Sequence, residues 1–385
     1  MKISELLQEG RGGSAKSPRA ISETAPVVRS LAELRSAAEP TSFTADYIFC
    51  ITICKLNYAK GRKTALALAI SFSILYHYLN GLICPDYITS ERKNHMNILS
   101  EINDKVYLSQ INIAGTHDSA TAYVAMENSA RCQDKTIAEQ LAMGIRFLDI
   151  RLTRKGSEFY LIHSLADCYS DKAKTNRLTF GEVLNDCKSF LNENPAETVI
   201  LSIKQDRGII NRWFFPSFYD KYIKGDEKNW YLKNEIPTLG ECRGKIVLMR
   251  RCRVWQSFYK SAEGGLNFSF WKDQARKKLT AKRVVLNKNA EALVQDRYGL
   301  EPKIKWQCAK HYLDTAETSP TKCAVHFIST SAKTNGTLVG TAEYINKEFM
   351  QYPLKKNAGW IICDFPAKEL VEKIMTSNIE KSEKI

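Results

Sequence analysis

A chain of 385 residues is long enough for one large domain with extensions or for two domains, and its 44% hydrophobic content is ordinary for a globular protein. Its 56 lysines and arginines outnumber its 42 aspartates and glutamates, and the net charge of +14 favours an anionic partner, either nucleic acid or an anionic membrane surface. The sequence contains no zinc-finger spacing, RNP-like motif or Walker loop, so nucleic acid is the weaker alternative. The 11 cysteines are scattered without paired spacing, which excludes a disulfide scaffold.

The N-terminal part of the chain divides into two segments. Residues 1–45 are rich in Ser, Ala, Arg, Glu and Gly, which predicts a mostly disordered extension that could serve targeting or export. Within residues 46–90, the stretch 64–84 has no charged side chain and about the length that crosses a bilayer. Two interpretations stay open: a membrane-inserted segment, or a buried helix packed on the following domain. The chain is therefore expected at a membrane, either exported or anchored by a single span.

Residues 91–385 have the pattern of one α/β domain. Capping boxes at 136–139 and 179–182 predict the starts of two helices, and each helix is followed by an apolar run typical of a buried strand. Helix followed directly by strand is the order expected for a parallel sheet. Two later helices are predicted at 338–352 and 366–375, the second with a proline in its first turn.

Six apolar runs each end at a polar or ionisable side chain. In chain order they lead to His117 and Asp118, to Asp149 and Arg151, to His163, to Lys204, to Arg250 and Arg251, and to Asp364. In an α/β barrel the C-terminal ends of the strands share one face, where catalytic groups lie. These side chains are therefore expected to meet at one polar mouth of a barrel.

Two imidazoles, a guanidinium and several carboxylates suit metal-free cleavage of a phosphodiester. One histidine can accept a proton from a nucleophile while the other donates one to the leaving oxygen, and an arginine stabilises the developing charge. The rival is a divalent metal site formed by His117, Asp118, Asp149 and Asp364. Arg151 argues against that site, because its fixed positive charge would repel a cation.

The same residues carry a family resemblance. The motifs are Gly115–Ser119, Phe147–Arg151 with the later His163, Phe190–Thr198, Gly244–Leu248, Val294–Tyr298 and Gly359–Asp364. Residues 105–375 resemble bacterial-type phosphatidylinositol-specific phospholipase C, the X-domain family. The resemblance implies a distorted TIM barrel in which the inositol 2-hydroxyl attacks its own phosphate. Diacylglycerol would leave, and the inositol 1,2-cyclic phosphate that forms would be hydrolysed slowly.

The resemblance also implies individual roles. His117 would be the general base oriented by Asp364, and His163 the general acid assisted by Asp118. Arg151, held by Asp149, would bind the phosphate where the calcium-dependent branch of the family has a metal, so no metal requirement is expected. Four further positions would contact the inositol ring, namely Lys204, Arg251, Asp296 and Tyr298. Arg250 is the alternative to Arg251, because strand alternation directs only one of them to the mouth.

Two departures from the family pattern leave the localisation and the headgroup preference open. The N-terminal extension lies outside the family domain, and Gln205 stands where a second ligand-side lysine is expected. One alternative is an inositol-lipid binding module tethered by residues 64–84; another is a different lipid phosphodiesterase, such as a metal-dependent glycerophosphodiesterase. Aromatic residues at 212–215, or around Trp255 and Trp271, would either contact the membrane interface or belong to the core.

Overall fold

The structure is a computed structural model. It describes residues 96–208, 212–255, 257–258, 263–272, 274, 281–331 and 337–379. The expectations for residues 1–45 and 46–90, including the candidate membrane segment 64–84, lie outside the described residues. Within the described ranges, no helix is both long enough and apolar enough to cross a membrane.

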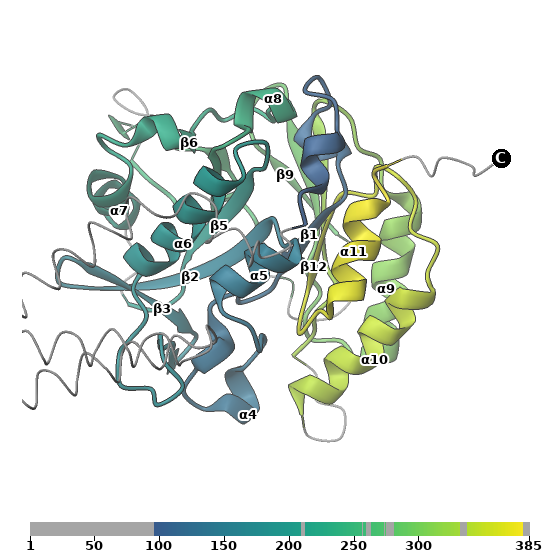
Figure 1. The fold of residues 1–385 in the computed structure, drawn as a ribbon, viewed down its shortest axis with the longest axis horizontal. Coiled ribbons are helices and arrows are strands. Elements are labelled where there is room, and N and C mark those ends of the chain that lie inside the picture. Colours follow the sequence, from purple (N-terminus) through teal and green to yellow (C-terminus); the bar gives the residue numbers. More distant parts are fainter. Residues whose placement is uncertain are drawn as a thin grey trace, which may run out of the picture. The chain divides into compact units, whose positions relative to one another are not determined.

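A single large sheet organises the described residues (Figure 1). Its order is β6 (Trp230–Tyr231), β7 (Ile246–Arg250), β5 (Val199–Gln205), β2 (Phe147–Lys155), β1 (Ile113–Thr116), β12 (Trp360–Cys363), β11 (Lys322–Phe327), β10 (Glu291–Gln295) and β9 (Lys282–Val285). Neighbours along this path are parallel except β9 and β10. β8 (Leu266–Asn267) pairs with β7, and the antiparallel strands β3 (Glu158–His163) and β4 (Ala166–Asp167) extend from β2. The fold is a distorted TIM barrel, as predicted, whose sheet stays open between β8 and β9 in the described part.

Helices follow the strands and cover the outside of the sheet (Figure 1). The α-helices are α4 (Glu127–Ala130), α5 (Ile137–Met143), α6 (Phe180–Glu193), α7 (Phe214–Tyr222), α8 (Leu239–Cys242), α9 (Pro302–Thr315), α10 (Leu338–Gln351) and α11 (Lys368–Thr376). Short 3-10 turns occur at Ile98–Glu101, Leu108–Gln110, Thr121–Tyr123 and Glu227–Asn229. Both predicted capping boxes are present, at Thr136 with Glu139 and at Thr179 with Glu182. The two C-terminal helices are also confirmed, within two residues of their predicted bounds.

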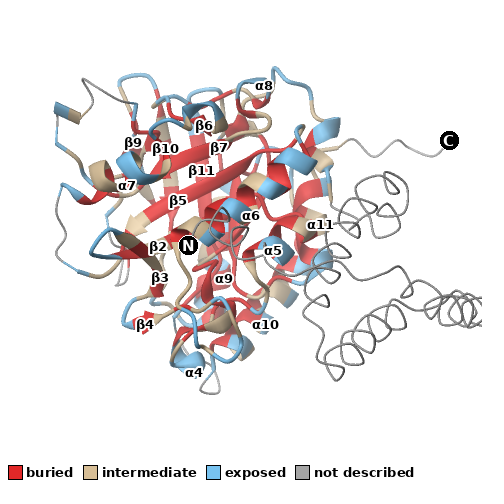
Figure 2. Ribbon diagram, turned by 60° about the vertical axis from the view of Figure 1, so that its left-hand side comes forward, coloured by how far each residue is buried: buried red, intermediate tan, exposed pale blue. Residues whose placement is uncertain are grey.

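The central strands are buried on both faces, as expected where helices cover a parallel sheet. β1, β7 and β12 contain only buried residues, and the strands form the buried centre of the molecule in Figure 2. β1 approaches β2 so closely that a Cβ on Gly115 would lie 2.8 Å from the Cβ of Phe147. Glycine at this position lets the strand that leads to His117 pack against the strand that carries Asp149.

A buried ion pair joins β2 and β5 at the opposite end of the sheet from His117. Arg146 Nε donates to Glu197 Oε2 at 2.6 Å, and both side chains are fully buried. The guanidinium also donates to the carbonyls of Leu141, Ile145 and Met96. Arg146 therefore links the end of α5 and the start of β2 to Glu197, which precedes β5, and to Met96.

Candidate active site

The ends of neighbouring strands bring the predicted catalytic side chains together. His117 and Asp118 follow β1 directly, and Asp364 follows β12, which is the parallel neighbour of β1. Asp149 and Arg151 lie on β2, on the other side of β1, and His163 ends β3. These residues are separated by up to 247 positions in sequence, yet they make direct polar contacts.

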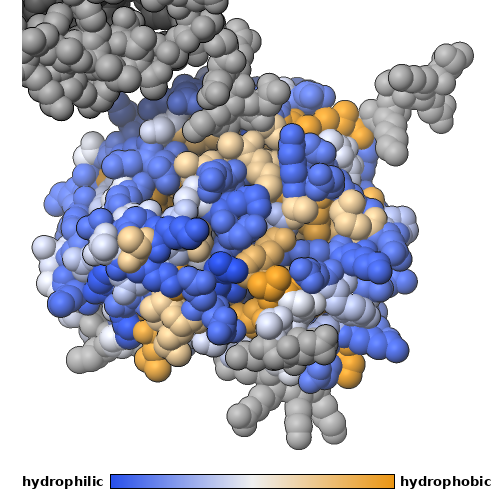
Figure 3. Space-filling model, turned by 60° about the horizontal axis from the view of Figure 1, so that its bottom comes forward, coloured by the Kyte–Doolittle hydropathy of each residue, from blue (hydrophilic) through white to orange (hydrophobic). Residues whose placement is uncertain are grey.

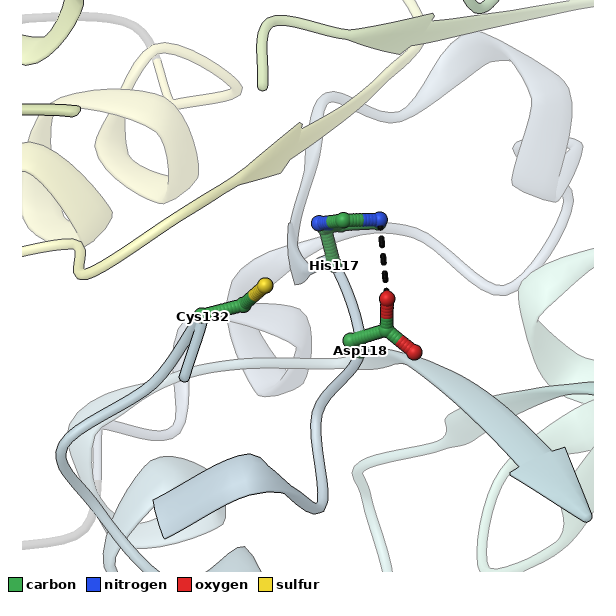
Figure 4. Close-up of side chains that lie close together, drawn as sticks. All are labelled: His117, Asp118 and Cys132. Atoms are coloured by element: carbon green, nitrogen blue, oxygen red, sulfur yellow. Dashed lines mark ion pairs between the residues drawn. The ribbon is translucent and has the colours of Figure 1, made fainter. Parts of the chain in front are cut away.

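His117 lies between two carboxylates. Its Nδ1 is 2.9 Å from Asp364 Oδ1, and its Nε2 is 3.0 Å from Asp118 Oδ2, the contact drawn in Figure 4. Burial alone would lower the pKa of His117, but Asp364 and Asp118 outweigh it and raise that pKa well above its usual value. Without substrate, the site therefore favours the protonated imidazolium. A general base has to be neutral, so a proton must leave Nε2 before His117 can accept another one.

A single carboxylate, that of Asp118, connects both histidines with an arginine. Its Oδ2 is also 3.4 Å from His163 Nε2, and its Oδ1 is 2.9 Å from Arg151 Nε. Burial opposes ionisation, but Arg151 and the two histidines hold the pKa of Asp118 well below its usual range. The other nitrogen of His163, Nδ1, lies 2.7 Å from the carbonyl of Ala130, which directs Nε2 toward Asp118. This is the arrangement of an imidazole oriented by backbone and assisted by a carboxylate.

Asp149 holds two guanidinium groups side by side. Its buried carboxylate lies 3.1 Å from Arg151 Nη2 through Oδ2 and 2.9 Å from Arg251 Nη1 through Oδ1. Arg151 Nη2 is also 2.9 Å from His117 Nε2, which is a hydrogen bond when His117 is neutral. An anionic group bound next to His117 would meet a preorganised guanidinium.

The structure distinguishes Arg251 from Arg250. Arg250 is fully buried and donates to the carbonyls of Gly264 and Cys252, away from the histidines. The guanidinium of Arg251 contacts Asp149 and lies 3.6 Å from the centroid of the Trp271 ring. Trp271 therefore lies at the candidate site. Sequence patterns identified it only as an aromatic residue of either the membrane interface or the core.

The remaining predicted ligand residues differ in how the structure places them. Lys204 donates to Asp206 Oδ1 at 2.5 Å. Asp296 follows β10, where burial raises its pKa although Lys305, Arg251, His117 and Arg151 all act to lower it. Tyr298 contributes its carbonyl to hydrogen bonds from the segment after β11. A contact between its ring and the inositol stays a prediction.

Two polar residues of the site were not found from the sequence. Asp206 accepts hydrogen bonds from Lys204 and from the backbone N–H of Ser164, next to His163. Burial acts to raise the pKa of Asp206, but the positive charges of Arg151 and Lys204 outweigh it and lower that pKa to about 2. Gln133 Nε2 donates to the carbonyls of His117 and Cys363 and so joins the ends of β1 and β12. The alternation Lys204-x-Asp206 places both side chains on one face and could have signalled Asp206. No local pattern marks Gln133.

His117, Asp118 and Cys132 form the group that comes nearest to a metal site in the described part of the chain. Their potential ligand atoms lie within 4.8 Å of one another (Figure 4). Burial raises the pKa of the Cys132 thiol to about 12, and Arg151 already contacts Asp118. A cation here would have to displace a guanidinium and a thiol proton, so this donor set fits a metal poorly.

Comparison with known proteins shows what this chain is similar to. Residues 108–252 match the model of the phosphatidylinositol-specific phospholipase C X domain. A 1-phosphatidylinositol phosphodiesterase of Staphylococcus aureus is 27% identical over 311 residues, which cover 74% of this chain and 95% of the relative. A protein with the same name from Listeria monocytogenes is 24% identical and covers 73% of this chain and 84% of the relative.

Solved structures agree with the sequence comparisons. A phosphatidylinositol-specific phospholipase C from Staphylococcus aureus superposes with a TM-score of 0.61 at 25% identity, over 76% of this chain and 99% of that one. The Listeria monocytogenes enzyme has a TM-score of 0.59 at 22% identity, over 75% of this chain and 99% of that one, and shows the shared fold.

Proposed function

We propose, from the match of residues 108–252 to the phosphatidylinositol-specific phospholipase C X domain and from the similarity to the Staphylococcus enzyme, that this chain cleaves phosphatidylinositol to diacylglycerol and inositol 1,2-cyclic phosphate. The observation that carries the proposal is the pair of histidines that share Asp118 beside Arg151. A headgroup-binding module has no need for an acid–base pair. The alignment covers 95% of the Staphylococcus relative, so the proposal rests on similarity to nearly the whole of that protein.

In the first step, neutral His117 accepts the proton of the inositol 2-hydroxyl at Nε2, and the oxygen attacks phosphorus. Asp364 stabilises the imidazolium that forms, because its carboxylate lies 2.9 Å from Nδ1. Arg151 takes the position next to the phosphate oxygens, where its charge stabilises the negative charge that develops in the transition state.

As the P–O bond to the glycerol breaks, the leaving oxygen takes a proton from His163, and diacylglycerol departs. Asp118 connects His163 with His117 through one carboxylate, at 3.4 Å and 3.0 Å. In the slower second step the roles reverse, so that water attacks the cyclic phosphate with His163 as base. Lys204, Arg251 and Asp296 are proposed to hold the ring hydroxyls.

We propose further that the reaction requires no metal, because Arg151 supplies the positive charge. Phosphorus NMR of the full chain with phosphatidylinositol in detergent, with and without EDTA, tests both proposals. A cyclic phosphodiester signal that persists in EDTA is the expected result. A signal that EDTA abolishes and a metal restores would favour a metal-dependent lipid phosphodiesterase, and lipid binding without turnover would favour a binding module.

The lipid substrate implies contact with a membrane surface, and we propose that five exposed residues provide part of it. This outer patch consists of Arg212, Trp213, Arg253, Trp255 and Phe270. Its aromatic side chains are 65%, 45% and 59% exposed for Trp213, Trp255 and Phe270, whereas Phe214 and Phe215 are buried. Arg212 lies over the Trp255 ring at 4.5 Å and Arg253 over the Phe270 ring at 5.4 Å, so cationic and apolar groups alternate.

The patch lies on loops that follow the C-terminal ends of β5, β7 and β8, the strand ends that also lead to the site. Hydrophobic surface likewise gathers in the middle of the face drawn in Figure 3, between hydrophilic side chains. Arginine with exposed tryptophan and phenylalanine suits the interface of an anionic bilayer. The net charge of the chain, +14, is positive like the two arginines of the patch, which also suits an anionic surface.

A further inference from the structure

Lys305 is a charged residue in a place where lysine is rarely found. It lies on α9 and is fully buried, whereas its helix neighbours Lys303 and Lys310 are exposed. A buried ammonium loses its hydration and is tolerated only where it finds polar partners. The mechanism proposed above makes no use of this residue, so its partners indicate what it does.

The partners of Lys305 lie on both sides of Asp296 in the sequence. Its Nζ donates to Gln295 Oε1 at 2.9 Å and to the carbonyl of Arg297 at 3.2 Å. Gln295 Oε1 also accepts from the backbone N–H of Arg297 at 3.1 Å, and its Nε2 donates to the carbonyl of Phe327 at 3.0 Å. The segment after β10 is thereby tied to α9 and to the end of β11.

The charge of Lys305 acts on Asp296. Among the described residues, Nζ donates to two neutral oxygens and contacts no carboxylate that would cancel its positive charge. Burial lowers the pKa of Lys305 to about 8, and Asp296 gives the largest opposing contribution, ahead of Cys308 and Asp364. In return, Lys305 gives the largest contribution that opposes the rise of the Asp296 pKa on burial. The two groups therefore favour each other's charged forms.

We propose that Lys305 is a positioning residue, which fixes the segment carrying Asp296 and keeps the Asp296 carboxylate charged for binding the inositol hydroxyls. This inference rests on the proposed function. The inference goes beyond the proposed function, because Lys305 touches no substrate. Lys305 acts only through Gln295, the Arg297 carbonyl and the electric field of its charge at Asp296. Its effect should appear in the binding of the inositol ring, while the proton transfers at His117 and His163 proceed as before.

A double-mutant cycle on the full chain tests the inference, with soluble inositol 1,2-cyclic phosphate as substrate. Lys305→Met and Asp296→Asn are each expected to raise KM about tenfold, the effect of losing a charged hydrogen-bonding group, and to change kcat much less. The double variant should be no worse than Asp296→Asn alone, because Lys305 acts through Asp296. Lys305→Arg should recover part of the lost affinity, and Lys303→Met, on the exposed side of the same helix, should match the wild type.

The outcomes separate the two proposals. Wild-type turnover with an unchanged KM in Lys305→Met, or a full additional loss in the double variant, overturns the positioning role alone. A wild-type chain that cleaves neither phosphatidylinositol nor the cyclic phosphate overturns the proposed function and this inference with it. If Lys305→Met does not fold, Gln295→Met enters the same cycle, and it too should lose its effect in the Asp296→Asn background.

Discussion

Asp118 contacts more of the candidate catalytic groups than a single pair of residues would require. Its carboxylate lies within 3.4 Å of both catalytic-candidate imidazoles and 2.9 Å from Arg151. A backbone φ of 43°, in the left-handed region that few residues other than glycine adopt, places it there directly after His117. Strained backbone of this kind is common where side-chain placement matters for function. Asp118 thus joins the imidazoles of His117 and His163 and the guanidinium of Arg151 in one network of charges.

At this scale the first prediction concerns the pH dependence of catalysis. Asp364 and Asp118 raise the pKa of His117 above 6.5, so kcat/KM should rise with pH along an acidic limb that lies above this value. Asp364→Asn removes the negative charge beside Nδ1, which lowers the pKa of His117. The limb should therefore move to lower pH by about one unit or more, with a lower plateau. A pH profile of cyclic-phosphate hydrolysis measures this.

The control for this profile is Asp134→Asn, which removes an exposed carboxylate that pairs with Lys135. Its limb should coincide with that of the wild type. A limb that stays in place or moves to higher pH in Asp364→Asn would contradict the assignment of His117 as the base.

A second prediction concerns the guanidinium of Arg151. Arg151→Met removes the charge that faces the developing oxyanion and should lower kcat by roughly 10²- to 10³-fold, the usual effect of losing one such stabilising group. Steady-state kinetics of the EDTA-treated full chain measures it. Lys155→Met, an exposed change on the same strand, should leave kcat as it is. A kcat within a few-fold of wild type in Arg151→Met would count against the proposed role of this arginine.

At the scale of the elements, the two ends of the parallel strands carry different groups: the candidate site lies at one end, and a buried ion pair lies at the other. The site lies at the C-terminal ends of β1 and β12 and at Asp149 and Arg151 within β2, while Arg146 and Glu197 join the starts of β2 and β5. The Arg146 guanidinium lies over the Phe190 ring at 4.3 Å, so α6 contributes to the same cluster. Stability can therefore be perturbed at a distance from the catalytic groups.

The corresponding prediction is that Glu197→Gln lowers the free energy of unfolding by about 3–5 kcal/mol, because it leaves a buried guanidinium without its counter-charge. Urea unfolding followed by circular dichroism measures the change. In contrast, Glu372→Ala breaks an exposed i,i+4 pair with Lys368 and should cost about 0.5 kcal/mol or less. Equal effects of the two changes would show that burial of the Arg146–Glu197 pair does not matter for stability.

At the scale of the whole molecule, the proposed binding to a membrane surface depends both on net charge and on exposed aromatic side chains. We expect the excess of basic residues to attract the chain to anionic lipid over a distance set by the ionic strength. The outer patch would then supply contacts of apolar side chains with the interface. These contributions differ in their dependence on salt, so they can be separated by experiment.

We expect Trp213→Ala and Trp255→Ala each to weaken binding of the full chain to phosphatidylinositol-containing anionic vesicles by about tenfold, since burial of a large apolar side chain contributes roughly 1.5–3 kcal/mol. Vesicle sedimentation at two salt concentrations measures it, and hydrolysis of the soluble cyclic phosphate should be unaffected. Ile304→Ala, a change at an exposed apolar residue of α9 outside the patch, is the control. If the tryptophan variants bind vesicles as the wild type does, the patch is not the membrane contact.

The sequence by itself predicted six of the described strands, four of the described helices and the residues expected to be catalytic. Capping boxes, apolar runs and motif residues are local patterns, so the amino-acid order alone was enough to name His117, Arg151 and Asp364. The tertiary structure decided what those residues touch. It distinguished Arg251 from Arg250, and it placed Asp118 between two histidines.

Only the tertiary structure found the supporting groups Gln133, Asp206 and Lys305, and only it placed Trp271 against Arg251. The physical reason is the range of the contacts. Asp364 meets His117 across 247 residues of sequence, and Glu197 meets Arg146 across 51. A pattern within a strand or helix shows which way a side chain points, but pairing across the sheet depends on register and closure, which no local pattern encodes.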